Sequence, residues 1–140
     1  NSIQNLEYAF ANAFNQLIIA NRLPSSNNKE EKEKQNAIQK ANEFAIEIPL
    51  EVISHCLRII ELSEELSDNG NPNLVSDAGV SAEVSLAGVR GAAMNVLINL
   101  IGIDDDSYCN KKRELVNKFI NDAEKNWKIV FDKTMKKIIS

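Results

Sequence analysis

Apolar residues recur every three or four positions along almost the whole chain, which is the spacing of one face of an α-helix. This pattern predicts helices over residues 3–22, 50–68 and 106–138, and another from the charged run Lys29–Lys34 to Ile48. Alternation with a period of two, the mark of a β-strand, is absent. We therefore expect an all-α fold, an up-and-down bundle of long antiparallel helices joined by short turns.

Each helix has an apolar stripe that is expected to face the core. The stripe of the first helix is Leu6, Phe10, Phe14 and Leu17. The stripe of the last helix is Leu115, Phe119, Ala123, Trp127, Val130 and Ile138.

Breakers and caps divide the helices. Pro49 is expected to break or kink the pattern, because proline lacks an N–H group and clashes with the preceding turn. Residues 25–28 (SSNN) offer N-caps, and residues 104–107 (DDDS) can cap the last helix. Asn69-Gly70 with Pro72 just beyond is typical of a helix stop.

The stretch Gly70–Asn99 is the part around which the chain is organised. Between Ala78 and Ile103 only Glu83 and Arg90 carry charge. The segment is helical in pattern, although each of its three glycines costs roughly 1 kcal/mol against alanine in a helix interior. These are Gly79, Gly88 and Gly91. Glycines kept at this cost indicate that a neighbour approaches closely.

Two rows run along this central helix. We expect one row to be a core stripe: Val80, Val84, Ala87, Gly91, Met94, Ile98 and Ile101. The other is a seam of small residues that ends in two amides: Ser81, Ser85, Gly88, Ala92, Asn95 and Asn99. A helix that is apolar nearly all round is buried. Because few helices are available to enclose it, we expect a second subunit to cover part of it, so that the bundle oligomerises.

The amides Asn95 and Asn99 are candidate site residues. A buried polar group without a partner costs about 1–3 kcal/mol, so both amides need one. Either they bond backbone groups or each other across an interface, or they line a cleft and bind a polar heterocycle.

A second polar group precedes the central helix. Asn73 or Ser76 can be its N-cap, and Asp77 in its first turn suits the helix dipole. Together with Asn71 they form a polar cluster at a helix N-terminus, which can also bind an anion or hold a general acid.

Composition narrows the function. A chain of 140 residues suits a single domain, 1–140, and its net charge of −4 disfavours a nucleic-acid or anionic-membrane partner. The longest apolar run is interrupted by polar residues, so it is a poor membrane span. Cys56 and Cys109 lack metal-ligand spacing and are expected to be free thiols in a reducing cytoplasm. His55 lies on a polar stripe one turn after Glu51, which favours a surface role over that of a catalytic base.

The segments IPLEVISHCLRIIELSEELSDNGNPNLVSDAGV and GAAMNVLIN resemble the folate cyclodeaminase/cyclohydrolase family, and the resemblance covers nearly the whole chain. It implies a helical homodimer that acts on tetrahydrofolate one-carbon units, as methenyltetrahydrofolate cyclohydrolase or formiminotetrahydrofolate cyclodeaminase. Both reactions pass through a tetrahedral carbon between two nitrogens, and both need proton transfer but neither a metal nor a cofactor beyond the folate substrate. We expect Asn71, Asn73, Ser76, Asn95 and Asn99 to bind substrate and Asp77 to act as acid or base.

Two departures bear on catalysis. The family's N-terminal Gly-rich helical segment is not within this sequence, and Asn1 is not a start methionine. The resemblance also implies an aspartate in a DxxAF pattern, and Phe10 stands at that position. A helical module of the same fold that has lost turnover, with or without folate binding, is therefore the alternative.

Overall fold

The structure, a computed structural model, describes residues 2–69 and 71–140. It contains the helices α1 (Ser2–Asn21), α2 (Asn28–Asn69), α3 (Val75–Leu100) and α4 (Asp106–Ile139), with a short 3₁₀ turn at Pro72–Leu74 before α3. No strand occurs in the described ranges. The prediction of an all-α up-and-down fold is confirmed.

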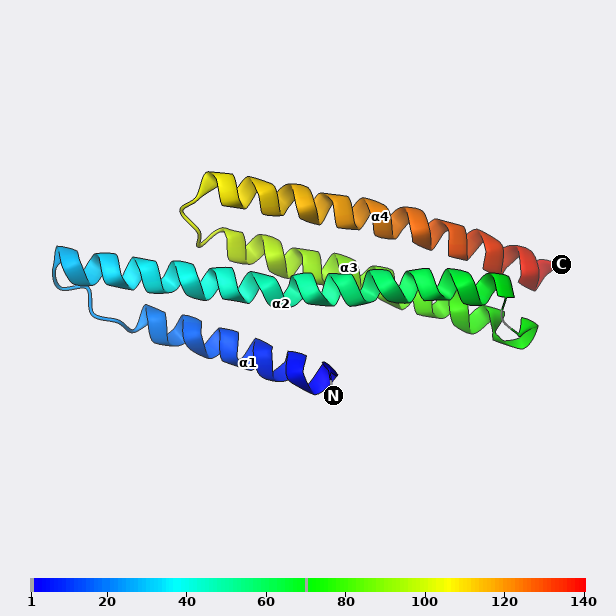
Figure 1. Cartoon of the computed structure of the whole chain (residues 1–140), viewed down its shortest axis with the longest axis horizontal. Helices are drawn as coiled ribbons and strands as arrows, with labels where there is room; N and C mark the ends of the chain where they lie inside the picture. The colour runs from blue at the N-terminus through cyan, green and yellow to red at the C-terminus, as the bar shows by residue number, and fades with distance from the viewer. Residues whose placement is uncertain (1, 70) are drawn as a thin grey trace.

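Figure 1 shows that successive helices run in opposite directions, and that α2 is the helix against which the other three pack. α1 lies alongside the first half of α2, while α3 and α4 pack together against the rest of it. α3 has the most extensive contacts with α2 and also packs along α4. The bundle therefore has three helices along most of its length and gains α1 at one end.

Pro49 does not break the helix, so the expected boundary between residues 48 and 50 is wrong. α2 runs through it as one helix of 42 residues. Ile46, Ile53 and Ile60 are fully buried at steps of seven on both sides of the proline. These core contacts hold the two halves of α2 on one axis. Proline has no N–H to donate to the carbonyl of Ala45, and this carbonyl accepts a hydrogen bond from α3 instead.

Side-chain caps begin α2 and α4 as predicted. Asn27 Oδ1 accepts from the backbone N–H groups of Lys29 and Glu30 at 3.1 and 3.0 Å. Asp105 is the N-cap of α4, and its side chain accepts from the N–H of Tyr108 at 2.9 Å.

The predicted caps of α3 are wrong. Its N-cap position is Leu74, without a side-chain cap hydrogen bond, because the 3₁₀ turn at residues 72–74 leads directly into the helix. Asn71 instead closes this turn: its Oδ1 accepts from Asn73 N at 3.0 Å, and its carbonyl accepts from Leu74 N at 2.8 Å. Asp77 lies in the first turn of α3, as expected.

The core face of α3 is not the row that the sequence predicted. Its buried residues are Val75, Ala78, Ala82, Ser85, Leu86, Val89, Ala92, Ala93, Val96 and Leu100. In the predicted core stripe, the side chains of Val80, Val84, Met94, Ile98 and Ile101 are between 61% and 77% exposed. A nearly all-apolar helix has no polar face to mark its outside, so the pattern could not distinguish the two sides.

Two glycines of α3 permit close helix packing. A Cβ added at Gly79 would lie 2.8 Å from Thr134 Cγ2 on α4, and one at Gly88 would lie 2.7 Å from Cys56 Sγ on α2. Gly91 differs, since an added Cβ meets nothing within 4 Å. The expected close approach is confirmed at the first two positions.

The apolar stripes of α1 and α4 were both predicted to face the core, and the structure places them differently. Among the α1 side chains that the structure describes, Phe10 and Phe14 are exposed and the buried ones are Ala13 and Ala20, because only one side of α1 is covered. The side chain of Leu6, also in the predicted stripe, lies outside those described. On α4, the predicted stripe faces inward except at Ile138, which is 56% exposed.

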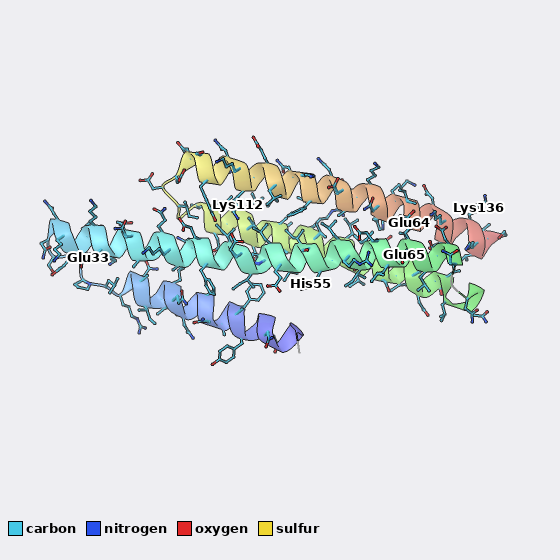
Figure 2. All side chains as sticks on the ribbon, viewed as in Figure 1. Glu33, His55, Glu64, Glu65, Lys112 and Lys136 are labelled. Carbon is cyan, nitrogen blue, oxygen red and sulfur yellow. The ribbon has the colours of Figure 1, made fainter. Side chains whose placement is uncertain are left out.

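Ion pairs join α4 to α2 at both ends. Lys112 Nζ lies 2.7 Å from Glu47 near the start of α4. Near its end, Lys133 Nζ lies 2.8 Å from Glu64 and 2.6 Å from Asp68. Figure 2 shows Lys112 and Glu64 at these two places along the bundle.

Candidate functional site

A groove lies where α1, α2 and the second half of α3 meet. Its volume is about 290 Å³. It is lined by Phe10, Ala13, Phe14, Leu17, Ala45, Asn95, Ile98 and Asn99. The groove therefore combines an apolar wall from α1 with two amides from α3.

The two amides differ in burial, and the expectation that both are buried is wrong. Asn95 is exposed, whereas Asn99 is half-buried and its Nδ2 donates to the Ala45 carbonyl at 3.5 Å. Asn99 therefore agrees with both alternatives that the sequence left open, because it bonds a backbone group and also lines a cleft. The side chain of Asn99 also carries an acceptor, Oδ1, which this hydrogen bond does not use.

The aromatic wall comes from positions that the sequence assigned to a core stripe. Phe10 is 40% exposed and Phe14 is 66% exposed, and both lie along the groove that holds the amides. The sequence placed these phenylalanines on one face of a helix but contained no signal for the element that this face meets. None of the described residues that line the groove is titratable.

The other predicted site residues lie at the far end of α3. Asn71, Asn73, Ser76 and Asp77 are all exposed. Asp77 and Asn95 are 18 residues apart, which is five turns and about 27 Å along a helix. Within one chain, therefore, the polar turn and the amides do not share a groove.

A second groove of about 280 Å³ runs between α3 and α4. It is lined by Ser76, Gly79, Val80, Glu83, Val84, Phe131, Thr134, Met135 and Ile138. Its walls are almost entirely apolar, because it lies beside the exposed row of α3. The sequence reasoning missed it, since it assigned Val80 and Val84 to the core.

The remaining candidate side chains, one histidine and two cysteines, agree with the non-catalytic roles that the sequence predicted. His55 Nε2 lies 3.6 Å from Glu51 Oε1 on the outer side of α2, so the surface interpretation is confirmed. Cys56 and Cys109 are free thiols, and burial raises the pKa of Cys56.

In the described part of the chain, no three metal-ligating side chains cluster. Within residues 2–69 and 71–140, no helix has the length and hydropathy needed to cross a membrane.

Comparisons with known proteins agree on one family. The sequence model of the formiminotransferase-cyclodeaminase family matches residues 6–118. The chain is 35% identical over 100 residues to a methenyltetrahydrofolate cyclohydrolase of Methylorubrum extorquens. The matched region covers 71% of this chain and 48% of that protein. It is 31% identical over 116 residues to the formimidoyltransferase-cyclodeaminase of Rattus norvegicus, covering 83% of this chain and 21% of that protein.

The fold agrees with a solved structure. The crystal structure of formiminotetrahydrofolate cyclodeaminase from Thermotoga maritima superposes with a TM-score of 0.68 at 25% identity, over 95% of this chain and 60% of that one. The chain thus spans about half the length of the cyclohydrolase that it matches, and a smaller share of the larger enzyme. With a family match over residues 6–118 and the same helical fold, the chain belongs to the formiminotransferase-cyclodeaminase family.

Proposed function

We propose that this chain binds a tetrahydrofolate derivative in the groove of Phe10, Phe14, Asn95 and Asn99 and acts on its one-carbon unit. The reaction is either hydrolysis of 5,10-methenyltetrahydrofolate or ring closure of 5-formiminotetrahydrofolate with release of ammonia. The observation that carries the proposal is the meeting of an aromatic wall and two amides in one groove. The names of the similar proteins supply the substrate class.

The groove suits the pteridine end of a folate. A flat heterocycle packs well against aromatic side chains, and its polar edge needs donors and acceptors that an amide supplies. A volume of about 290 Å³ is at the small end for ligand sites, so only part of a folate fits inside it. The remainder of the substrate extends along the exposed surface.

The chemistry requires an acid or base beside the bound carbon. In both reactions a tetrahedral carbon forms between two nitrogens, and a proton must reach the nitrogen that leaves it. An aspartate can do this, and a phenylalanine cannot. We propose that Asp77 is the acid or base, with Asn71, Asn73 and Ser76 as substrate contacts beside it.

A second candidate function is folate binding without turnover. The observation that favours it is Phe10, an apolar side chain in the groove at the position where the family resemblance implies an aspartate. Such a module would keep the aromatic wall and the amides but lack the proton carrier.

The test measures binding and turnover separately. Absorbance at the methenyl band follows hydrolysis, an ammonia assay follows ring closure, and a thermal shift with tetrahydrofolate follows binding. Asn95→Ala and Asn99→Ala should weaken binding, while Asn117→Ala, an exposed asparagine of α4, should not. Absence of both turnover and binding would refute the site, and binding without turnover would establish the second candidate.

The engineered variant Phe10→Asp distinguishes the two candidates further. If the native chain binds without turnover, a carboxyl at position 10 should produce a measurable rate, because it lies beside the amides. Phe14→Asp, one turn along the same wall, is the matched control.

The proposal includes a homodimer in a reducing cytoplasm. The exposed apolar row of α3 supports the dimer, since contiguous apolar surface of this kind marks interaction sites. The two free thiols support the compartment. Light scattering at micromolar concentration tests the dimer, and a monomer mass would count against it.

A further inference from the structure

Phe10 and Phe14 form a pair of open aromatic rings on α1, called here the α1 aromatic pair. They are four residues apart, so they share one face of the helix, with about 5–6 Å between their Cβ atoms. Phe10 is 40% exposed and Phe14 is 66% exposed, and both line the groove that also holds Asn95 and Asn99. The two rings are therefore open to a ligand in this groove.

Two other aromatic rings of the chain already contact a cation. Lys112 Nζ lies 5.3 Å from the centre of the Tyr108 ring, and Lys128 Nζ lies 5.6 Å from the centre of the Phe131 ring. In the described part of the chain, no lysine or arginine lies over the α1 aromatic pair. An aromatic face attracts a cation because its π electrons give it a partial negative charge. The α1 aromatic pair can therefore offer this attraction to a ligand.

We propose that the α1 aromatic pair selects folates by charge, and binds forms whose one-carbon unit is a cation in preference to neutral forms. The inference rests on the proposed function for its ligand, and it adds the ligand property that is recognised and the residues that recognise it. The preferred forms are 5,10-methenyltetrahydrofolate and protonated 5-formiminotetrahydrofolate. The disfavoured forms are tetrahydrofolate and 10-formyltetrahydrofolate.

The charge of the methenyl form lies within the ring system that the groove is proposed to hold. N5 and N10 share this charge across the methenyl carbon, in a five-membered ring that is fused to the pteridine. A phenyl ring that packs against the flat pteridine therefore also lies close to the cation. The glutamate carboxylates are the same in all of these folates, so their contribution cancels when two forms are compared.

The remaining lining of the groove is compatible with a cation. None of the described lining residues carries a positive charge that would repel it. Asn95 and Asn99 contribute amide oxygens, whose partial negative charge also favours a cation. Because a cation–π contact is weaker at an exposed site, we expect a preference of about threefold for one exposed ring and up to about thirtyfold where the ligand excludes water.

Charge recognition affects the two candidate reactions differently. In hydrolysis, water adds to the methenyl carbon, the bond from this carbon to N5 breaks, one water proton moves to N5 and the other is released. The product, 10-formyltetrahydrofolate, is neutral there and should leave more readily than the substrate binds. In ring closure, N10 bonds to the formimino carbon and ammonia leaves with the N10 proton. The cation then resides in the new ring, so this product should remain bound and inhibit.

Fluorination of the rings tests the recognition of charge with little change in shape. Phenylalanine analogues with one, two or three fluorine atoms, placed at position 10 or 14, have progressively less negative charge on the ring face. The Kd of 5,10-methenyltetrahydrofolate should rise stepwise with the number of fluorines, while that of tetrahydrofolate should change by less than about twofold. Rapid mixing at the methenyl absorbance band separates binding, which shifts the band, from hydrolysis, which removes it. Tetrahydrofolate is measured by competition.

Leucine variants give a simpler form of the same test. Phe10→Leu and Phe14→Leu keep an apolar side chain but remove the π electrons, so each should weaken binding of the methenyl form about threefold to thirtyfold more than binding of tetrahydrofolate. Tyr8→Leu removes an 80% exposed ring of the same helix that does not line the groove, and it is the matched control. All three side chains are exposed, so the urea midpoints should match that of the native chain.

The contrary results are defined. If fluorination leaves the Kd of the methenyl form unchanged, or if the leucine variants weaken both folates equally, the α1 aromatic pair is only an apolar wall and the inference is overturned. The proposed function would stand in that case, because both folates still bind.

A pair of probes without folate separates the inference from the proposed function. The 1,3-dimethylbenzimidazolium cation and neutral 1,3-dimethylindole have nearly the same size and shape and differ in charge. An NMR titration of the native chain should show tighter binding of the cation, with shifts at the amides Asn95 and Asn99, and Phe10→Leu/Phe14→Leu should abolish the preference. Failure of every folate to bind would refute the proposed function, whereas a preference for the cationic probe would still support charge recognition. Equal affinity for the two probes would overturn it.

Discussion

Asn99 donates from Nδ2 to the carbonyl of Ala45 at 3.5 Å, and Ala45 is the residue four positions before Pro49. In a regular helix this carbonyl would accept from the N–H of residue 49, which proline lacks. One side chain of α3 therefore compensates a proline in α2. The same amide lines the candidate site, so one residue both bonds α2 and forms part of the groove.

This relationship predicts coupling between Asn99 and Pro49. Asn99→Ala should lower the free energy of unfolding by about 0.5–1.5 kcal/mol, because the Ala45 carbonyl loses its donor. In a Pro49→Ala background the loss should be much smaller, since the alanine N–H replaces the amide. Urea denaturation of the four proteins gives the coupling energy. Equal losses in both backgrounds would show that the hydrogen bond contributes nothing.

Close packing at Gly79 predicts a second coupling. Gly79→Ala should destabilise the chain by about 1–3 kcal/mol, because the added Cβ would be 2.8 Å from Thr134 Cγ2 in a buried contact. Thr134→Ser removes that methyl group, so Gly79→Ala in this background should cost less or should stabilise through helix propensity. Thermal denaturation measures both, with Thr134→Ser alone as the reference. An unchanged cost would mean that α4 is not held by this contact.

The helix caps differ in their predicted effects. Asn27→Ala and Asp105→Ala should each cost about 0.5–2 kcal/mol, because each removes an acceptor for N–H groups in a first helical turn. Asn73→Ala and Ser76→Ala should change the free energy of unfolding little, since the cap position of α3 is Leu74. Chemical denaturation checks all four. A large loss in the free energy of unfolding for Ser76→Ala would show that Ser76 caps α3, as the sequence predicted.

The ion pairs of Lys133 predict a pH dependence. Hydrogen bonds to Asp68 and then Glu64 raise the pKa of Lys133 above its ordinary value of 10.5. A raised folded-state pKa means that the stabilisation is fully present below about pH 10.5 and is lost as the pH rises through the folded-state value. The difference in urea midpoint between the native chain and Lys133→Met should therefore be constant from pH 7 to 9 and shrink above about pH 10.5. A difference that does not shrink above about pH 10.5 would contradict this account.

Much of the fold could be predicted because its signals are local. The 3.6-residue period identified the helices, and short polar side chains at Asn27 and Asp105 identified two of their starts. The net charge and the segments that resemble the folate cyclodeaminase/cyclohydrolase family restricted the predicted function to an enzyme of that family or an inactive module of the same fold. Asn95, Asn99 and Asp77 could be named as candidates, because amides and a carboxylate are conspicuous along an apolar helix.

The tertiary structure decided what depends on contacts between distant residues. α2 continues through Pro49, and the Ala45 carbonyl that the proline leaves without a donor accepts from Asn99, 50 positions later, a partner that no local pattern contains. The outward face of α3 was assigned as core because an all-apolar helix shows no polar side. Phe10 shares a groove with the amides only because α1 packs against α2. Sequence periodicity determined which residues share a face, and packing alone determined which faces meet.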